Sequence, residues 1–185
     1  MASREFDPRR LDVAAFAAAA GELAGEFPAE ALPRLASATL APAADLPRPG
    51  VRWRVDGERR PLPGAGVQAS LLVTASADVT LECQRCLQPM QVPLRAGRRI
   101  FFVDGEDAAE ALDAENEDDV LALAPVLDLP ALIEDELLLA LPLVPRHEVC
   151  PEPLPRGLVD GDPAAVSAEN PFAVLAALKQ GSRPN

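Results

Sequence analysis

Apolar and polar residues alternate most regularly between Leu71 and Cys83. Every odd-numbered residue in this stretch is apolar, and every even-numbered residue from Thr74 onward is polar. A period of two residues is typical of a strand with one buried and one solvent-exposed face. The alternation therefore predicts a long strand that ends with Cys83 turned toward the buried side.

The segment from Val92 to Phe102 has the same kind of alternation, interrupted only by Arg98. We expect it to run back alongside the strand at 71–83. The turn between them lies at 83–86, so the two segments form a hairpin closed by a pair of cysteines.

Two shorter segments complete the predicted sheet. Residues 51–55 alternate between apolar and basic side chains and precede the turn dipeptide Asp56-Gly57. Residues 120–127 are apolar enough for another strand, and the proline among them confines that strand to an edge or a bulge. The proline-rich region 27–49 predicts turns, with room for one edge strand.

Two helices are predicted to pack against this sheet. The first begins at Asp7 or Pro8 and extends to about Leu23, because its apolar residues recur at helical spacing within an alanine-rich run. Asp128 is a suitable N-cap for a second helix at 129–141, and the leucines of that helix form a core-facing stripe. The same pattern predicts that its acidic residues lie on the opposite, solvated face.

The end of the chain has a different character. Residues 151–169 are rich in Pro, Gly and Ala and resemble a linker or an extended loop. A short helix is predicted at 170–181, with Asn170 as N-cap and Pro171 in the first turn. A helix of about ten residues is marginal alone in water, so we expect it to dock on its own domain or on a partner. The docking face comprises Phe172, Leu175 and Leu178.

These elements define an α+β fold. We expect an antiparallel sheet or a partly closed barrel, flanked by the N-terminal helix, the 129–141 helix and the C-terminal docking helix. The single α+β domain occupies residues 1–150, and an acidic loop interrupts it at 104–119. That loop contains nine acidic residues and no basic one, which predicts self-repulsion and mobility.

Charge is unevenly distributed along the 185 residues, whose net charge is -12. Residues 1–103 contain 13 Arg and 11 acidic residues, whereas residues 104–185 contain 4 basic and 18 acidic residues. Such an acidic protein is unsuited to coating nucleic acid with its whole surface and favours a basic partner. The chain has no apolar stretch of membrane-spanning length and no basic flank before an apolar run, so we expect a soluble, cytoplasmic protein.

All the thiols and the one imidazole of the chain fall into two pairs with metal-ligand spacing. Cys83 and Cys86 form a C-x-x-C pair, and His147 and Cys150 form an H-x-x-C pair. Zinc prefers four such ligands in a tetrahedron, so a structural Cys3His zinc site follows if the two pairs meet in space. The competing interpretation is a reduced surface turn and an unrelated loop.

Catalytic motifs are absent from the sequence. There is one His, no Tyr, no nucleophile elbow and no phosphate-binding glycine loop, and no small-molecule substrate is indicated. We therefore expect a protein that is not an enzyme. The alternative is a thiol-redox or RNA-modifying enzyme that uses Cys83 and Cys86. A redox pair usually places its first Cys at a helix N-terminus, whereas a strand precedes this one.

Arginines cluster on the strands around the cysteine turn. If they share a face, they form a local RNA-binding patch despite the acidity of the whole chain, and the competing interpretation is ordinary exposed strand arginine. The candidate RNA-binding residues are Arg52, Arg54, Arg85, Arg95, Arg98 and Arg99.

Three runs of sequence resemble the bacterial YceD family of large ribosomal RNA subunit accumulation proteins. They are LECQRC at 81–86, DL at 128–129 continued by EDELLLALPLVP at 134–145 with His147 and Cys150, and NPFAVLAALK at 170–179. Their order and spacing match the family over most of residues 70–180. The first seventy residues resemble it only in general character.

The resemblance implies a role in the synthesis, processing or stability of large-subunit ribosomal RNA, without an established catalytic activity. The implied partner is pre-ribosomal large-subunit RNA or a basic protein associated with it. We therefore expect a non-enzymatic ribosome-biogenesis factor.

Overall fold

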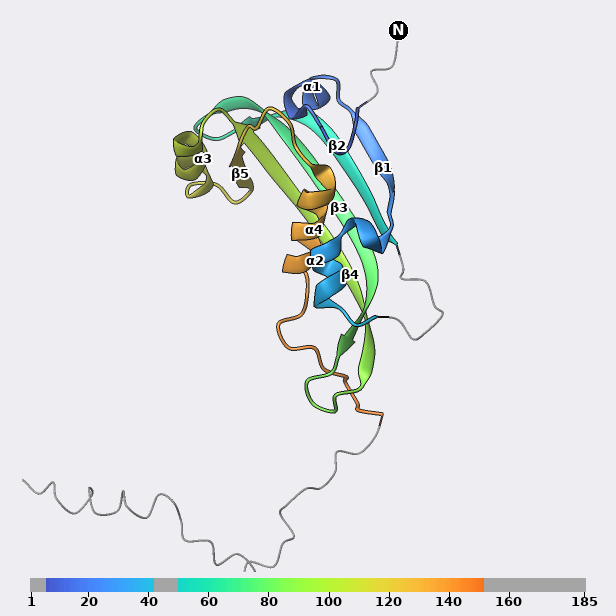
Figure 1. Ribbon diagram of the computed structural model, residues 1–185. Coiled ribbons are helices and arrows are strands. Elements are labelled where there is room, and N and C mark those ends of the chain that lie inside the picture. The colour runs from blue at the N-terminus through green and yellow to red at the C-terminus, as the bar shows by residue number, and fades with distance from the viewer. Residues whose placement is uncertain (1–5, 42–49, 152–185) are drawn as a thin grey trace, which may run out of the picture. The chain divides into compact units, whose positions relative to one another are not determined.

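The computed structural model describes residues 6–41 and 50–151 (Figure 1). The chain divides into two compact units, residues 1–148 and 149–185. Only Val149, Cys150 and Pro151 of the second unit are described, so the predicted docking helix at 170–181 lies outside the described residues, as does nearly all of the predicted linker.

The described part of the first unit has one five-stranded sheet with the strand order β1-β2-β3-β4-β5. The strands are β1 (Glu22–Phe27), β2 (Val51–Leu62), β3 (Gly66–Glu82), β4 (Pro89–Val103) and β5 (Asp119–Ala122). From β1 to β4 each strand is antiparallel to the next, whereas β5 runs parallel to β4. The α+β class is confirmed, but the sheet is mixed and open, so the purely antiparallel sheet and the barrel were wrong.

The parallel strand results from a helix that the sequence did not predict. α3 (Glu106–Asp113) occupies half of the predicted acidic loop and returns the chain to the start of β5. Ala109 of α3 packs with Phe101 and Val120, and Asp113 accepts a hydrogen bond from the Val120 N–H at 2.8 Å. The acidic side chains of α3 remain exposed while its apolar side packs on the sheet. A charged segment that predicted a loop can therefore form a helix.

β2 is longer than expected because the predicted turn at Asp56-Gly57 is continuous strand. A Cβ on Gly57 would lie 2.4 Å from Phe16 Cδ1, so the glycine accommodates a close approach of the aromatic ring. The turn instead lies after Leu62, where Gly64 and Gly66 have positive φ angles of 82° and 73°. These are angles that glycine adopts without the steric cost of a Cβ.

The predicted N-terminal helix is also shorter than its pattern suggested. α1 (Val13–Ala18) ends before Ala20, whose φ is 48°, and the chain then enters β1. Gly57 donates its N–H to the Gly21 carbonyl at 2.8 Å, which fixes the start of β1 beside β2. Leu23 therefore belongs to a strand and not to the predicted helix.

Three helices cover one face of the sheet (Figure 1). They are α1, α2 (Pro33–Ala38) and α4 (Leu129–Leu139), and the 3-10 turn η1 (Ala29–Ala31) precedes α2. Phe16, Leu35 and Ile133 from these helices join one core cluster with Val55 and Val73 of the sheet. α2 replaces the turns and edge strand predicted for this region. On the other face, α3 covers the part around Phe101 and Val120. The rest of that face, which carries the even-numbered residues of β3 from Leu72 onward, is hereafter the open face.

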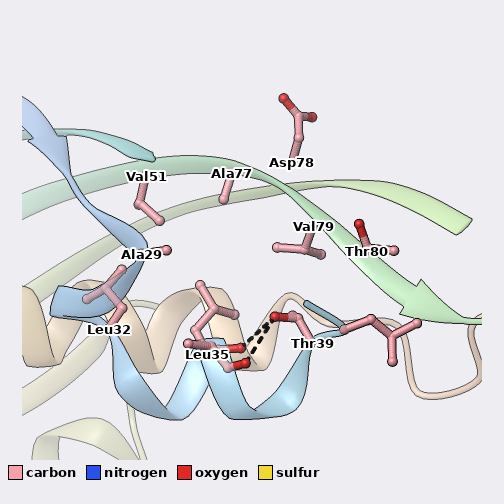
Figure 2. Close-up of a pocket in the computed structure, with 11 residues that line it drawn as sticks. Ala29, Leu32, Leu35, Thr39, Val51, Ala77, Asp78, Val79 and Thr80 are labelled. Carbon is pink, nitrogen blue, oxygen red and sulfur yellow. Dashed lines mark hydrogen bonds between the residues drawn. The ribbon is translucent and has the colours of Figure 1, made fainter. Parts of the chain in front are cut away.

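An apolar groove lies between α2 and the far half of β3 (Figure 2). Ala77 and Val79 point from β3 toward the helix, whereas Asp78 points away from it. Leu35 closes the helix side of the groove, and Leu40 donates its N–H to the Thr80 carbonyl at 2.8 Å.

Among the described helices, none has the length and apolar composition that crossing a membrane requires.

Candidate metal centre

The end of the β3–β4 hairpin is a tight turn built around two cysteines. Cys83 donates its N–H to the Gln88 carbonyl at 3.0 Å, and Leu87 donates its N–H to the Cys83 carbonyl at 2.8 Å. Leu87 has a φ of 59°, the left-handed conformation that reverses the chain after Cys86. As the alternation predicted, Cys83 is fully buried.

The segment that follows α4 runs beside this turn. Gln84 donates its N–H to the Pro145 carbonyl at 2.9 Å, and the Arg85 guanidinium donates to the His147 carbonyl at 2.9 Å and to that of Glu148 at 3.3 Å. These contacts join residues about sixty positions apart, and they bring the second ligand pair to the first.

The ligand atoms of Cys83, Cys86, His147 and Cys150 all lie within 4.8 Å of one another. Three of them belong to the first unit, and Cys150 follows two residues after its end. Cys86 Sγ lies 3.4 Å from His147 Nδ1. In a tetrahedral zinc site with Zn–S about 2.3 Å and Zn–N about 2.0 Å, a sulfur and a nitrogen ligand lie roughly 3.5 Å apart. The cluster therefore fits a zinc ion.

The backbone around Cys83 favours the anionic form of its sulfur. Burial alone would raise the pKa of the Cys83 thiol, but the backbone N–H groups of His147, Arg85 and Cys86 donate hydrogen bonds to the sulfur and lower its pKa to about 5. The His147 N–H lies 3.4 Å from the sulfur. A thiolate is the form that binds metals, so the turn is arranged for coordination before any ion arrives.

The arrangement is chemically a closed site. Four protein ligands satisfy tetrahedral zinc and leave no position for water or substrate, which is typical of structural and not catalytic zinc. Thiol exchange that begins at Cys83 would need an accessible sulfur there, and Cys83 is fully buried, whereas Cys86 is partly buried. The geometry thus favours the zinc prediction over its redox alternative.

Comparison with known proteins places the chain in a family. The sequence model of the family described as Large ribosomal RNA subunit accumulation protein YceD matches residues 71–179. The chain belongs to the YceD family. The matched region contains both ligand pairs, all of β4 and α4, and β3 except for its first five residues. α1, α2, β1 and β2 precede the matched region.

A similar curated protein is the Large ribosomal RNA subunit accumulation protein YceD of Haemophilus influenzae (strain ATCC 51907 / DSM 11121 / KW20 / Rd). The two sequences are 40% identical over 108 residues, which are 56% of this chain and 61% of the relative. The chain thus spans about three fifths of the relative that it matches. No solved structure matches the chain.

The six arginines proposed to bind RNA lie in three environments of this YceD-family fold. Arg98 is on the helix-covered face, where it pairs with Asp119 at 2.7 Å and with Glu136 at 3.0 Å. Arg85 holds the segment around His147, as described above. The four on the open face, as the strand register shows, are Arg52, Arg54, Arg95 and Arg99.

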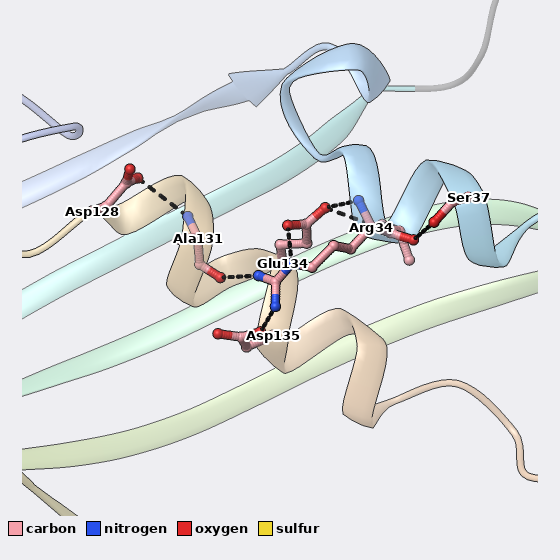
Figure 3. Close-up of polar contacts among 7 residues, drawn as sticks. Arg34, Ser37, Asp128, Ala131, Glu134 and Asp135 are labelled. Atoms are coloured by element: carbon pink, nitrogen blue, oxygen red, sulfur yellow. Dashed lines mark hydrogen bonds and ion pairs between the residues drawn. The ribbon is translucent and has the colours of Figure 1, made fainter.

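Two buried carboxylates were not expected. Glu134 was predicted to lie on the solvated face of its helix, but it is only 3% exposed and contacts Arg34 (Figure 3). Glu136 is similarly buried, and its pKa is raised by burial, against the opposing effect of Arg98. The prediction failed for Glu134 because α2, which provides Arg34, was not recognised, and it failed for Glu136 because that side chain faces Arg98 of β4.

The predicted partner-binding residues Phe172, Leu175 and Leu178 lie outside the described residues. Their assignment stays a prediction.

Proposed function

We propose that this chain is a non-enzymatic factor for the synthesis, processing or stability of large-subunit ribosomal RNA, and that a structural zinc ion completes its fold. The proposal depends chiefly on one observation: the family match covers both the hairpin turn and the segment after α4, and the ligands of the candidate metal centre come from these two parts. The family and the Haemophilus relative are both named for accumulation of this RNA.

Zinc is the metal that this ligand set favours. Three thiolates and an imidazole are soft or borderline donors, and a compact tetrahedral cluster of them suits zinc better than magnesium or calcium, which prefer oxygen ligands. When bound, the ion would link the β3–β4 hairpin to the segment that follows α4. The residues themselves do the positioning: Cys83 and Cys86 are fixed by the turn, and His147 is fixed by Arg85.

The absence of catalysis is part of the proposal. It is supported by the closed ligand set, in which all three thiols are ligands, and by the full burial of Cys83. A role beside ribosomal RNA would place the protein in the cytoplasm. The partner would be precursor RNA of the large subunit or a basic protein bound to that RNA.

The test is complementation in a bacterial strain that lacks its own YceD-family gene. The measured quantity is the ratio of large-subunit to small-subunit ribosomal RNA in total RNA. We expect the wild-type chain to restore the ratio, and Cys83→Ser/Cys86→Ser to fail at equal protein level. Failure of the wild-type chain at normal expression would refute the ribosomal role, whereas full restoration by the double variant would refute the requirement for metal.

A further inference from the structure

The open face of the sheet contains a shallow hollow where β2, β3 and β4 lie side by side. Its lining includes five basic or hydroxyl-bearing side chains, and we call this set the open-face hollow: Arg52, Arg54, Thr74, Ser76 and Arg95. Arg52 is directly opposite Ser76 on β3, and Ser76 is directly opposite Arg95 on β4. One row across three strands therefore places a hydroxyl between two guanidinium groups.

The two arginines of this row differ from their neighbours in having no ion pair with a described residue. Arg54 pairs with Asp56 at 2.6 Å and with Glu22 at 3.1 Å, and Arg99 pairs with Glu58 at 2.6 Å. None of the described acidic residues forms an ion pair with Arg52 or Arg95, and both arginines are exposed. Adjacent strands are about 4.8 Å apart, so the two unpaired cations start roughly 10 Å from each other.

A glycine opens the surface next to this row. Gly97 follows Arg95 by two residues on the same face and lies opposite Thr74. A Cβ built there would be 4.0 Å from Thr74 Cγ2, so the neighbouring side chains do not require a glycine. Its φ is not in the left-handed region either. A glycine inside a strand that neither packing nor backbone conformation requires often marks a place where a ligand approaches the backbone closely.

We propose that the open-face hollow binds the sugar-phosphate backbone of RNA, with Arg52 and Arg95 as the phosphate ligands. This inference rests on the ribosomal RNA role proposed above. The guanidinium fork matches phosphate oxygens in a bidentate manner. The Ser76 hydroxyl can donate to a phosphate or accept from a ribose 2′-hydroxyl, which a site for RNA can use and a site for an acidic peptide would not need.

The hollow is suited to backbone contacts and not to base recognition. Stacking requires an exposed aromatic ring, and the aromatic residue that lines the hollow, Trp53, has its ring in the helix-covered core, stacked on Phe27 with centroids 4.8 Å apart. Glu26 and Asp78 flank the row in the sheet, so the favourable potential is confined to a short stretch of backbone. We therefore expect binding that depends on salt and hardly on sequence.

The experiment measures the dissociation constant of the purified full-length chain for a single-stranded RNA oligonucleotide at several KCl concentrations. The test variant is Arg52→Gln/Arg95→Gln. The matched control, Arg10→Gln/Arg59→Gln, removes two exposed arginines that do not line the hollow. For two phosphate contacts we expect affinity to fall about tenfold in the test variant, and the slope of log K against log salt to decrease by roughly 1.4.

A second variant separates shape from charge. Gly97→Val keeps every arginine but adds bulk to the surface beside the row, so we expect weaker RNA binding with a nearly unchanged salt slope. Both variants should unfold at the wild-type urea concentration, because neither alters the core.

Three results would overturn the site: no RNA binding by the wild-type chain, equal losses in the test and control pairs, or a test variant that binds RNA normally but loses an acidic protein partner. Complementation of the deletion strain is scored separately. Restoration by Arg52→Gln/Arg95→Gln together with normal RNA binding would reject the hollow and leave the ribosomal role intact.

Discussion

The Glu134 carboxylate holds Arg34 through both the backbone and the side chain of that residue. Its Oε1 accepts a hydrogen bond from the Arg34 N–H at 2.7 Å, and its Oε2 accepts one from the Arg34 Nε at 2.8 Å (Figure 3). The Leu35 N–H also donates to Oε1, at 3.1 Å. Leu32, the N-cap of α2, has no side chain that could cap the helix, so a residue of α4 caps it instead.

Replacing Glu134 by Ala is expected to lower the free energy of unfolding by about 2–3 kcal/mol. The variant leaves two backbone N–H groups at the start of α2 without an acceptor, and hydrogen bonds to charged groups each contribute about 1.5–3 kcal/mol. Asp135→Asn is the matched control. Asp135 also pairs with Arg34, but its side chain is 52% exposed, so its loss should cost less than about 1 kcal/mol. Urea unfolding measures both, and equal effects would contradict the capping role.

Metal content tests the centre directly. Purified wild-type chain should contain close to one equivalent of zinc, because its ligand atoms are already grouped, and a chelator should lower its melting temperature. Cys83→Ser should bind less metal and melt at a lower temperature, and chelator should then have little further effect. Metal-free protein after purification without chelator, with all three thiols reactive in the folded state, would contradict the assignment.

The sequence predicted the parts of the fold that depend on local pattern. The alternation at Leu71 to Cys83 identified most of β3 and the inward direction of Cys83, and the spacing of the four ligands identified the cluster. β1 was missed because Leu23 is compatible with both periods. A tertiary contact decides between helix and strand for this segment: Phe16 packs over Gly57 of β2, and β1 pairs with β2.

The contact between Phe16 and Gly57 can be tested by adding one methyl group at Gly57. Gly57→Ala would place a Cβ 2.4 Å from Phe16 Cδ1 and 3.3 Å from the Ala17 Cα, so we expect overpacking to cost about 1–3 kcal/mol. Gly97→Ala, in β4 of the same sheet, is the control, because its Cβ would meet only Thr74 Cγ2, at 4.0 Å. That change should be neutral or slightly stabilising. Thermal unfolding of the two variants should differ clearly, and equal melting temperatures would show that the Phe16 ring moves freely.

Acidic residues were the least predictable class. A run of nine of them predicted a loop at 104–119, yet α3 forms there, since its charges stay exposed while Ala109 is buried. On α4, Glu134 and Glu136 lie on faces that only the neighbouring elements define: α2 provides Arg34, and β4 provides Arg98. Charge in a sequence shows that a side chain needs water or a partner, and it does not show which of the two it finds.

Glu136 connects three elements, because Arg98 of β4 pairs with it and also with Asp119 at the start of β5. Burial raises the pKa of Glu136 above its ordinary value of 4.5, and Arg98 opposes the shift without cancelling it. The folded chain therefore releases this proton at a higher pH than the unfolded chain does. Between those two pKa values the unfolded state binds fewer protons, so this residue's contribution to the free energy of unfolding decreases as pH rises.

Glu136→Gln should remove that dependence. At low pH the wild-type side chain is neutral and resembles glutamine, so the two proteins should differ least there. As pH increases from 4.5 through the raised pKa, the wild-type chain should lose stability relative to the variant, and the difference should then level off. Urea unfolding from about pH 4 to about pH 7 measures the difference, with Glu82→Gln as a control for the change in net charge at an exposed position. A difference that is independent of pH, or that moves in the wild-type protein's favour as pH rises, would show that the ion pair with Arg98 outweighs burial at this site.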